Sequence, residues 1–246
     1  MILFVFEGAK AEPTVFHSMH KLFIKNEEVC EVKCNYDLPT LYKRLKDNEY
    51  DLFRSLPFKE NNIEIPENKR LDTMFSQIFL FFDYDFQNRM GVEKLNEVID
   101  EMLDYFDNET EQGKLYINYP MVESLKYTKE MPDSQYKTYE IARESCVNHE
   151  FKGMAERFAY KEAKQYKFID TNKTSEEDVK HNWLLLKEQN VRKANYIINE
   201  LDIEPKTKDA INQKEIFNSQ KEKYVYSRDT VSVLNSFPLF LYEYLK

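Results

Sequence analysis

The chain has 246 residues, a length that suits one large domain or one medium domain with an appendage. Hydrophobic residues make up 42% of it and aromatic residues 15%, which is enough for a sizeable core and argues against global disorder. The net charge of −9 argues against a general nucleic-acid coat protein, because neutralising phosphates needs clustered Lys and Arg.

The charge is unevenly distributed along the chain. Residues 1–150 carry 18 basic and 29 acidic side chains, whereas residues 151–246 carry 17 and 15. An acidic first part is most often a solvated surface, but it also suits a site that gathers divalent cations. If nucleic acid binds, the basic contacts should come mainly from the second part or from a partner.

Neither a membrane span nor a secretory leader is predicted. No stretch approaches the roughly 18 apolar residues of a spanning helix. The opening apolar run lacks the preceding basic segment and the following cleavage site of a signal peptide. Three cysteines (Cys30, Cys34 and Cys146) form no zinc-like array. We therefore expect a cytoplasmic protein with no membrane partner.

The first part of the chain is predicted to alternate strands and helices. Ile2–Phe6 and Ile78–Phe82 are continuous apolar runs that end abruptly in acid, which is typical of strands buried on both faces. Two shorter strands are predicted at Val29–Val32 and Lys114–Asn118. The predicted helices begin near Pro13 and cover Leu38–Leu56, as one helix or two, and Val92–Phe106; polar Asn61–Lys69 is predicted to be a loop. This alternation predicts an α/β fold, with a parallel sheet between helices.

From about residue 130 onward the strand pattern stops. Helical apolar spacing covers Phe151–Phe168 and Val179–Leu201, and Ser175 with Asp178 resembles a capping box that opens the second helix. The late apolar run Phe237–Leu245 is predicted to be core or a partner contact. We therefore expect a first domain at residues 1–130 and a mainly helical C-terminal region at residues 131–246.

Carboxylates follow the two most apolar strands, and this is the most informative feature of the sequence. Glu7 follows the first strand, and Asp83 and Asp85 follow the third. The carboxyl ends of parallel strands form the edge at which ligands bind. In extended chain, Asp83 and Asp85 would share one face about 6.6 Å apart. Acids gathered at one edge repel one another unless a cation lies among them, and Mg²⁺ prefers such oxygen ligands.

Each of these acids also has a structural interpretation. A Glu after a strand commonly caps a turn or a helix, and an Asp-x-Asp pattern is frequent by chance. Their joint placement after two apolar strands favours the metal site. The histidines form no HExxH motif, and the four glycines exclude a Walker A loop and a Rossmann fingerprint. His17 and His20 share a helix face, where packing is the expected role.

Three segments together resemble the TOPRIM domain, which topoisomerases, DnaG-type primases and OLD-type nucleases share. FVFEGAKAEPTVF is similar to its opening motif, in the version found in RloB-like proteins. LFFDYDFQN is similar to the second motif, a strand followed by Asp-x-Asp, and INYPMVESLKY to the third element. The resemblance covers residues 1–130, about half of the chain, and implies a TOPRIM-like, Rossmann-like sheet. Ala11 stands where related members often carry Thr or Ser, so a hydroxyl contact is expected to be missing.

The resemblance implies a role for each matching residue. Glu7 would be a metal ligand or general base, and Asp83 and Asp85 would hold Mg²⁺ or Mn²⁺. Gly8 would allow a phosphate to approach the backbone. The acids expected to complete or orient a second ion are Glu12 and Glu123, although both also suit the first turn of a helix. Lys126 is the main candidate for a cation that steadies the phosphate, and the weaker candidates are Lys10, Arg89 and Lys152.

The resemblance implies a metal-dependent nuclease that cleaves DNA or RNA, acting in bacterial anti-phage defence beside an ATPase on a separate chain. Two alternatives stay open: a non-catalytic adaptor or sensor that keeps the fold, and a nucleotidyl transferase. The sequence leaves the oligomeric state open and does not distinguish DNA from RNA.

Overall fold

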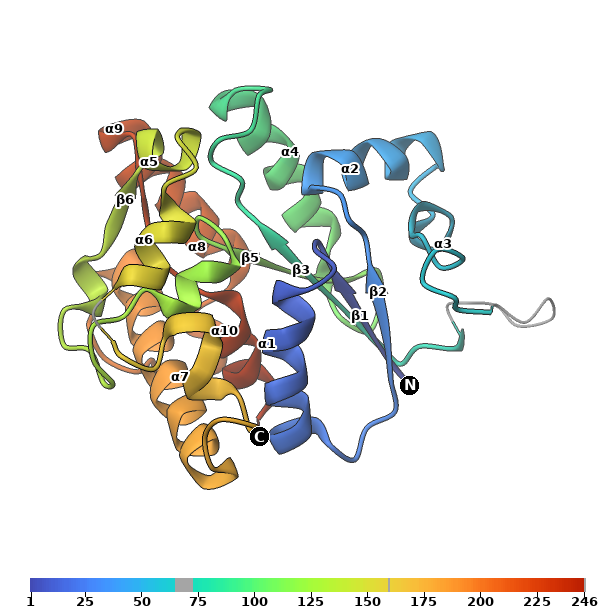
Figure 1. Ribbon diagram of the computed structural model, residues 1–246. Helices are drawn as coiled ribbons and strands as arrows, with labels where there is room; N and C mark the ends of the chain where they lie inside the picture. The colour runs from blue at the N-terminus through green and yellow to red at the C-terminus, as the bar shows by residue number, and fades with distance from the viewer. Residues whose placement is uncertain (65–72, 159, 246) are drawn as a thin grey trace.

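A five-stranded sheet forms the centre of the first half of the protein (Figure 1). The computed structural model describes residues 1–64, 73–158 and 160–245. The strand order is β2-β1-β3-β5-β4; all neighbouring strands are parallel except β4, which is antiparallel to β5. The strands are β1 (Ile2–Phe6), β2 (Val29–Lys33), β3 (Gln77–Asp83), β4 (Asp107–Asn108) and β5 (Gly113–Asn118). The predicted α/β class and all four predicted strands are confirmed, and the two-residue β4 at the end of this sheet was not foreseen.

Helices cover both faces of the sheet, because alternate residues of β1 and β3 point to opposite sides. Phe4, Phe6 and Phe81 pack in one apolar cluster with helices α1, α7 (Glu176–Asn199) and α10 (Ser236–Tyr244). Leu3 and Leu80 pack in the other cluster with α2, α4 and α8 (Gln213–Gln220). The helices of the first half are α1 (Ala11–Met19), which continues as a π-helix at His20–Ile24, α2 (Leu38–Asp47), α3 (Leu52–Ser55), α4 (Val92–Tyr105) and the 3₁₀ helix η3 (Val122–Lys126).

These helices match the predictions closely. The helix expected from Pro13 begins two residues earlier, and Leu38–Leu56 is two helices rather than one. In the predicted loop Asn61–Lys69, Asn61 holds both backbone polar groups of Lys33, at the end of β2, through its side-chain amide. Residues 65–69 of that loop lie outside the described residues.

The second half is mainly helical, as predicted, but it also contains a small sheet. β6 (Glu140–Ala142) pairs with β7 (Thr230–Ser232) in antiparallel fashion. The helical elements here are η4 (Tyr136–Thr138), α5 (Arg143–Val147), α6 (Phe151–Arg157), η5 (Lys164–Ile169), α7 (Glu176–Asn199), η6 (Lys208–Ala210), α8 (Gln213–Gln220), the π-helix η7 (Lys221–Val225), α9 (Tyr226–Arg228) and α10 (Ser236–Tyr244). The continuous helix expected over Phe151–Phe168 is wrong, since α6 ends at Arg157 and η5 contains two left-handed residues, Gln165 and Tyr166.

Two predicted details of the second half are confirmed. The hydroxyl of Ser175 accepts the backbone N–H of Asp178 at 3.1 Å and donates to its carboxylate at 2.6 Å, which caps α7. The late apolar run forms α10, whose Phe237 and Phe240 are fully buried against the aromatic face of the sheet. Figure 1 shows α7 and α10 lying against the sheet domain, so both apolar clusters combine residues from the two halves of the chain.

Lys193 of α7 is buried and links this helix to the segment before β6 through two hydrogen bonds. Its ammonium donates to the carbonyls of Tyr136 at 2.9 Å and Tyr139 at 2.8 Å, and burial lowers its pKa. We expect Lys193→Met to keep the apolar stem but to leave both carbonyls without a donor, costing about 2–4 kcal/mol of unfolding free energy. Urea unfolding measures this, with exposed Lys180→Met of the same helix as control at less than about 0.5 kcal/mol. If Lys193→Met lowered the free energy of unfolding as little as Lys180→Met does, the two hydrogen bonds of Lys193 would not stabilise the fold.

Candidate functional site

The candidate site lies where the sheet changes its winding direction. From β1 the chain proceeds to β2 on one side, and then crosses over to β3 on the other side of β1. In open parallel sheets the crevice at such a switch point, outside the carboxyl ends of the strands, is the usual place for a ligand. Glu7 directly follows β1 and Asp83 ends β3, so the fold itself places both carboxylates at this crevice.

Glu7 and Asp83 are in direct contact. The backbone N–H of Asp83 donates to Oε2 of Glu7 at 3.0 Å, while the N–H of Glu7 donates to the carbonyl of Phe81 at 3.1 Å. The two acids are therefore held side by side by the ladder of the sheet. Residues 76 positions apart in the chain meet here, as the strand pattern predicted.

Asn118, at the end of β5, is a site residue that sequence reasoning missed. It lies opposite Asp83 in the strand register, and its Nδ2 donates to Oδ1 of Asp83 at 3.1 Å. The amide is oriented from behind, because its Oδ1 accepts the backbone N–H of Ser236 at 3.0 Å and the Ser236 hydroxyl at 2.8 Å. Its position as the last residue of the strand after Asp83 was the available signal.

Glu12 and Glu123 approach the same carboxylates from two further elements. Glu12 is buried in the first turn of α1, and its carboxylate folds back over Gly8. Glu123 is buried in η3, where its Oε1 pairs with the ammonium of Lys152 at 2.9 Å. The ion pair raises the pKa of Lys152, whose side chain is otherwise exposed.

Glu7, Glu12 and Asp83 have raised pKa values. Burial is the main cause of the raised pKa of Asp83, and the charges of Glu7, Glu12 and Glu123 add to it. Burial likewise raises the pKa of Glu7, with further contributions from Glu12 and Asp85, although the Asp83 N–H opposes this. The pKa of Glu12 is raised by burial and by Glu123. The cluster therefore favours protons, or another cation, at its centre.

Asp85 lies apart from the position that the extended pattern predicted. Its φ of 53° turns the chain out of the strand immediately after Asp83, so the two side chains do not alternate along one strand. Gln87 and Asn88 donate to the Asp85 carboxylate, and Asn88 also donates to Asp37 at 2.9 Å. Asp85 still raises the pKa of Glu7, so it borders the site from the side of α2 and is not at its centre.

The predicted cation Lys126 is buried rather than solvated. Its ammonium lies 4.0 Å from the centre of the Tyr166 ring and 3.7 Å from Oε1 of Glu156. Burial lowers the pKa of Lys126, and Glu123 partly offsets this effect. Of the weaker candidates, Lys152 reaches the acids through Glu123, whereas Lys10 and Arg89 are exposed.

The donor set suits a hard cation that keeps part of its water shell. Among the described residues no three His, Cys, Asp or Glu side chains converge as a complete protein-only metal site. Mg²⁺, however, is commonly bound through one or two carboxylates plus waters and substrate phosphates. Glu7 and Asp83 provide such a pair, and the amide of Asn118 holds one oxygen of Asp83 in place.

The packing role expected for His17 is wrong, because its side chain is exposed and its Nε2 lies 2.8 Å from Oε1 of Glu31. The three cysteines are free. No described helix is long and apolar enough to cross a membrane.

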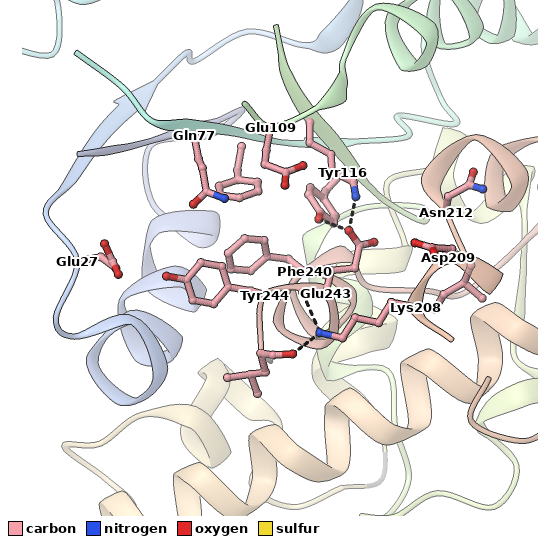
Figure 2. A pocket seen from close by; sticks show the side chains of 14 residues that line it. Glu27, Gln77, Glu109, Tyr116, Lys208, Asp209, Asn212, Phe240, Glu243 and Tyr244 are labelled. Carbon is pink, nitrogen blue, oxygen red and sulfur yellow. Dashed lines mark hydrogen bonds and ion pairs between the residues drawn. The ribbon is translucent and has the colours of Figure 1, made fainter. Parts of the chain in front are cut away.

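A cavity of about 730 Å³ lies at the opposite edge of the sheet, beside the first residues of β3 and β5 (Figure 2). There Glu243 is already paired with Lys114 and accepts the Tyr116 hydroxyl at 2.7 Å, so this carboxylate has its counter-ion within the chain.

Comparison of the chain with family models, curated proteins and solved structures finds no match in any of the three. The α/β fold and the contact between Glu7 and Asp83 are therefore known from the structure alone. The resemblance to TOPRIM domains is based only on the sequence motifs.

Gly8 is required for space rather than for backbone freedom. A Cβ at this position would lie 2.8 Å from Oε2 of Glu12. We expect Gly8→Ala to displace the Glu12 carboxylate, with a stability change below about 1 kcal/mol because the end of a flexible side chain can move. If the acids hold a divalent cation, its affinity should fall about 10-fold to 100-fold, as for other groups that orient ligands.

A double-mutant cycle measured by Mn²⁺ calorimetry checks this prediction. In a Glu12→Ala background, Gly8→Ala should have little further effect on affinity. Equal losses in both backgrounds would show that Gly8 acts on the site by another route.

Proposed function

We propose that the chain is a divalent-metal-dependent nuclease that hydrolyses phosphodiesters of DNA or RNA. The observation that carries the proposal is the contact of Glu7 with Asp83 at the switch point of the sheet, where burial and neighbouring acids raise both pKa values. Clustered carboxylates repel one another, which is costly in a folded protein. A cation that binds between them would remove this cost and explain why they lie together at the crevice. The three TOPRIM-like motifs support the same reaction class.

Each residue of the site has a defined task in this proposal. Glu7 and Asp83 would hold Mg²⁺ or Mn²⁺, which supplies Lewis-acid activation of water and phosphate. Asn118 fixes the orientation of Asp83, and Asp85 borders the site at the side of Glu7. Glu12 and Glu123 would hold the waters of this ion or a second ion.

Substrate binding would depend on a partner. The first 150 residues have an excess of acidic side chains, and two cations next to the acids, Lys126 and Lys152, already contact Glu156 and Glu123. Such a surface repels nucleic acid until a basic surface is added. We propose that an ATPase on another chain supplies it, in a defence system against phage.

The Lys152–Glu123 ion pair favours one alternative, a non-catalytic adaptor. The ammonium of Lys152, 2.9 Å from Oε1 of Glu123, neutralises part of the negative charge of the acids without a metal. In an adaptor, Mn²⁺ would not bind in a way that depends on Asp83, so calorimetry separates the two functions.

Cleavage assays test the nuclease directly. Purified protein would be incubated with plasmid, single-stranded DNA and tRNA, with Mg²⁺, Mn²⁺ or chelator, alone and with its partner ATPase. We expect metal-dependent cleavage of at least one substrate. A matched control is Glu109→Gln, which changes a carboxylate at the opposite edge of the sheet and should cleave like the wild type. Intact substrates in every mixture would refute the proposal.

A further inference from the structure

A second cavity, of about 560 Å³, lies where the start of α4 meets α9 and the first residue of α5. Its lining includes Gly91 and Val92 at the start of α4, together with Arg143, Tyr226 and Asp229. The small sheet brings these distant segments together, because Arg143 directly follows β6 and Asp229 directly precedes β7. The backbone N–H of Arg143 donates to the carbonyl of Asp229 at 2.9 Å, which fixes the arginine at the cavity.

The guanidinium of Arg143 has no counter-ion among the described residues. The residue is half-buried, and its side chain makes no hydrogen bond or ion pair with any described group. Its Nε is covered, and its nearest recorded neighbour is the Phe86 ring, whose centre lies 6.0 Å from Cζ. Arginine keeps its charge at every physiological pH and is seldom withdrawn from water without an anion. An unpaired guanidinium at a cavity therefore points to an anion from outside the chain.

The start of α4 adds further donors to the same cavity. The helix is 14 residues long, and no described side chain caps its first turn. Gly91 has φ of 89°, and a Cβ there would meet no atom within 4 Å, so this turn is open to the cavity. The free N–H groups and the dipole at a helix N-terminus favour negative charge, and phosphate groups are commonly bound there.

The other charged groups of the lining leave Arg143 as the unpaired cation. Arg228 is already paired with Glu140 at 2.7 Å. Glu93 and Asp229 are exposed, and neither carboxylate lies within 4.0 Å of the Arg143 guanidinium. Because water weakens the field of exposed acids, these two lower the affinity for an anion but do not take its place.

Tyr226 gives the cavity an aromatic wall. The residue is 59% exposed, and its hydroxyl accepts a hydrogen bond from the Asn96 amide at 3.2 Å, which holds the ring at the cavity. An exposed aromatic ring beside a cation suits a nucleotide, since the base can stack on the ring while the phosphate meets the cation.

We propose that this cavity binds a nucleotide, with its phosphate between Arg143 and the start of α4 and its base against the Tyr226 ring. The planar fork of a guanidinium matches two phosphate oxygens at once. Binding here goes beyond the proposed function and does not rest on it, because neither a metal nor Glu7 and Asp83 take part.

The nucleotide is either free or a unit of a single strand, and the phosphate chemistry is the same for both. The carbonyl of Asn88 accepts the Gly91 N–H at 3.3 Å, and the Asn88 amide donates to Asp85 at 2.9 Å. The cavity therefore lies next to the side of the candidate site that Asp85 borders.

NMR titrations of the full chain in chelator test the proposal with two probes, inorganic phosphate and thymidine 5′-monophosphate. In the wild type both probes should shift the backbone N–H signals at the start of α4 and at Arg143. Arg143→Gln should bind both probes about tenfold more weakly or worse, as for lost hydrogen bonds to a charged group. Tyr226→Ala should weaken the nucleotide alone, by about tenfold, because it removes the stacking surface.

Two further variants fix the sign and the location of the effect. Asp229→Asn removes a repelling carboxylate at a left-handed residue where Asn is tolerated, so it should bind both probes about twofold more tightly. The matched control is Arg54→Gln of α3, an exposed arginine that pairs with Asp51 at 3.2 Å. Figure 1 shows α3 on the opposite side of the molecule from α5 and α9, and this variant should bind like the wild type.

A third probe, single-stranded oligothymidylate, identifies the source of the nucleotide. Arg143-dependent binding that is tighter than that of the mononucleotide would assign the cavity to a nucleic-acid strand, and equal binding would assign it to a free nucleotide. Without phosphate, Arg143→Gln should unfold at the same temperature as the wild type, because no hydrogen bond or ion pair of the side chain is lost.

No shift of these signals in the wild type, or equal affinities of Arg143→Gln and the wild type, would overturn the nucleotide site. Asp83→Asn should bind all three probes at this cavity as the wild type does. The outcome is therefore separate from whether the chain is a nuclease.

Discussion

Asp83→Asn should abolish cleavage and at the same time make the metal-free protein more stable. Loss of a ligand that holds the metal should lower the rate on the order of 10³-fold or more, equivalent to about 4 kcal/mol of transition-state stabilisation. The neutral amide also removes a partly buried charge that repels Glu7, Glu12 and Glu123. Relief of such repulsion should raise the free energy of unfolding by about 1–2 kcal/mol in chelator.

Two measurements on the same protein preparation check the loss of activity and the gain of stability. The first is the initial cleavage rate with Mn²⁺, and the second is urea unfolding with chelator. Asp85→Asn is the matched comparison, since its carboxylate is already held by Gln87 and Asn88 away from the centre of the cluster. Its activity loss should be smaller. If Asp83→Asn retained cleavage, or if it destabilised the metal-free protein, the carboxylate would have a structural role instead.

The stability of the metal-free protein should fall as the pH rises from acidic to neutral. The pKa values of Glu7, Glu12 and Asp83 are raised, so the folded protein keeps protons that the unfolded chain loses above about pH 4. Because the folded state then binds more protons, the free energy of unfolding decreases with pH, by about 1.4 kcal/mol per pH unit for each proton retained. The decrease begins near the unfolded pKa values and ends once the raised pKa values are passed.

Thermal unfolding between about pH 5 and about pH 8 measures this slope, with chelator and with Mn²⁺. Lys126 and Lys193, whose pKa values burial lowers, act in the opposite sense in the alkaline range. We therefore compare how steeply the free energy of unfolding changes with pH in the wild type and in the Glu7→Gln/Asp83→Asn double variant. The variant should show the flatter profile, and Mn²⁺ should stabilise only the wild type, most strongly at high pH. Parallel profiles for the two proteins would contradict the coupling of these acids.

The sheet and the centre of the site could be predicted because their signals are local. Long apolar runs that end in acid have few alternatives to buried parallel strands, and the carboxyl ends of such strands meet at one edge. Glu7 and Asp83 follow from that reasoning alone. The position of Asp85 does not, because its left-handed backbone breaks the two-residue alternation on which the prediction depended.

The residues contributed by the second half could not be predicted, because they depend on packing between segments far apart in the chain. Asn118 is oriented by Ser236, 118 positions later. The helix predicted over Phe151–Phe168 breaks at η5, where Gln165 and Tyr166 are left-handed and Phe168 and Ile169 are buried. The short strands β6 and β7 lie 88 or more residues apart in sequence and carry no pattern long enough to identify either one.

The most direct test is an anomalous-difference map of crystals soaked in Mn²⁺. We expect a peak at the ends of β1 and β3, about 2.0–2.2 Å from carboxylate oxygens of Glu7 and Asp83, the distance at which small hard cations bind oxygen. The same soak of Asp83→Asn crystals should show no peak there. A wild-type map with no density between these two side chains, or with Mn²⁺ bound only elsewhere on the surface, would contradict the metal site and the nuclease built on it.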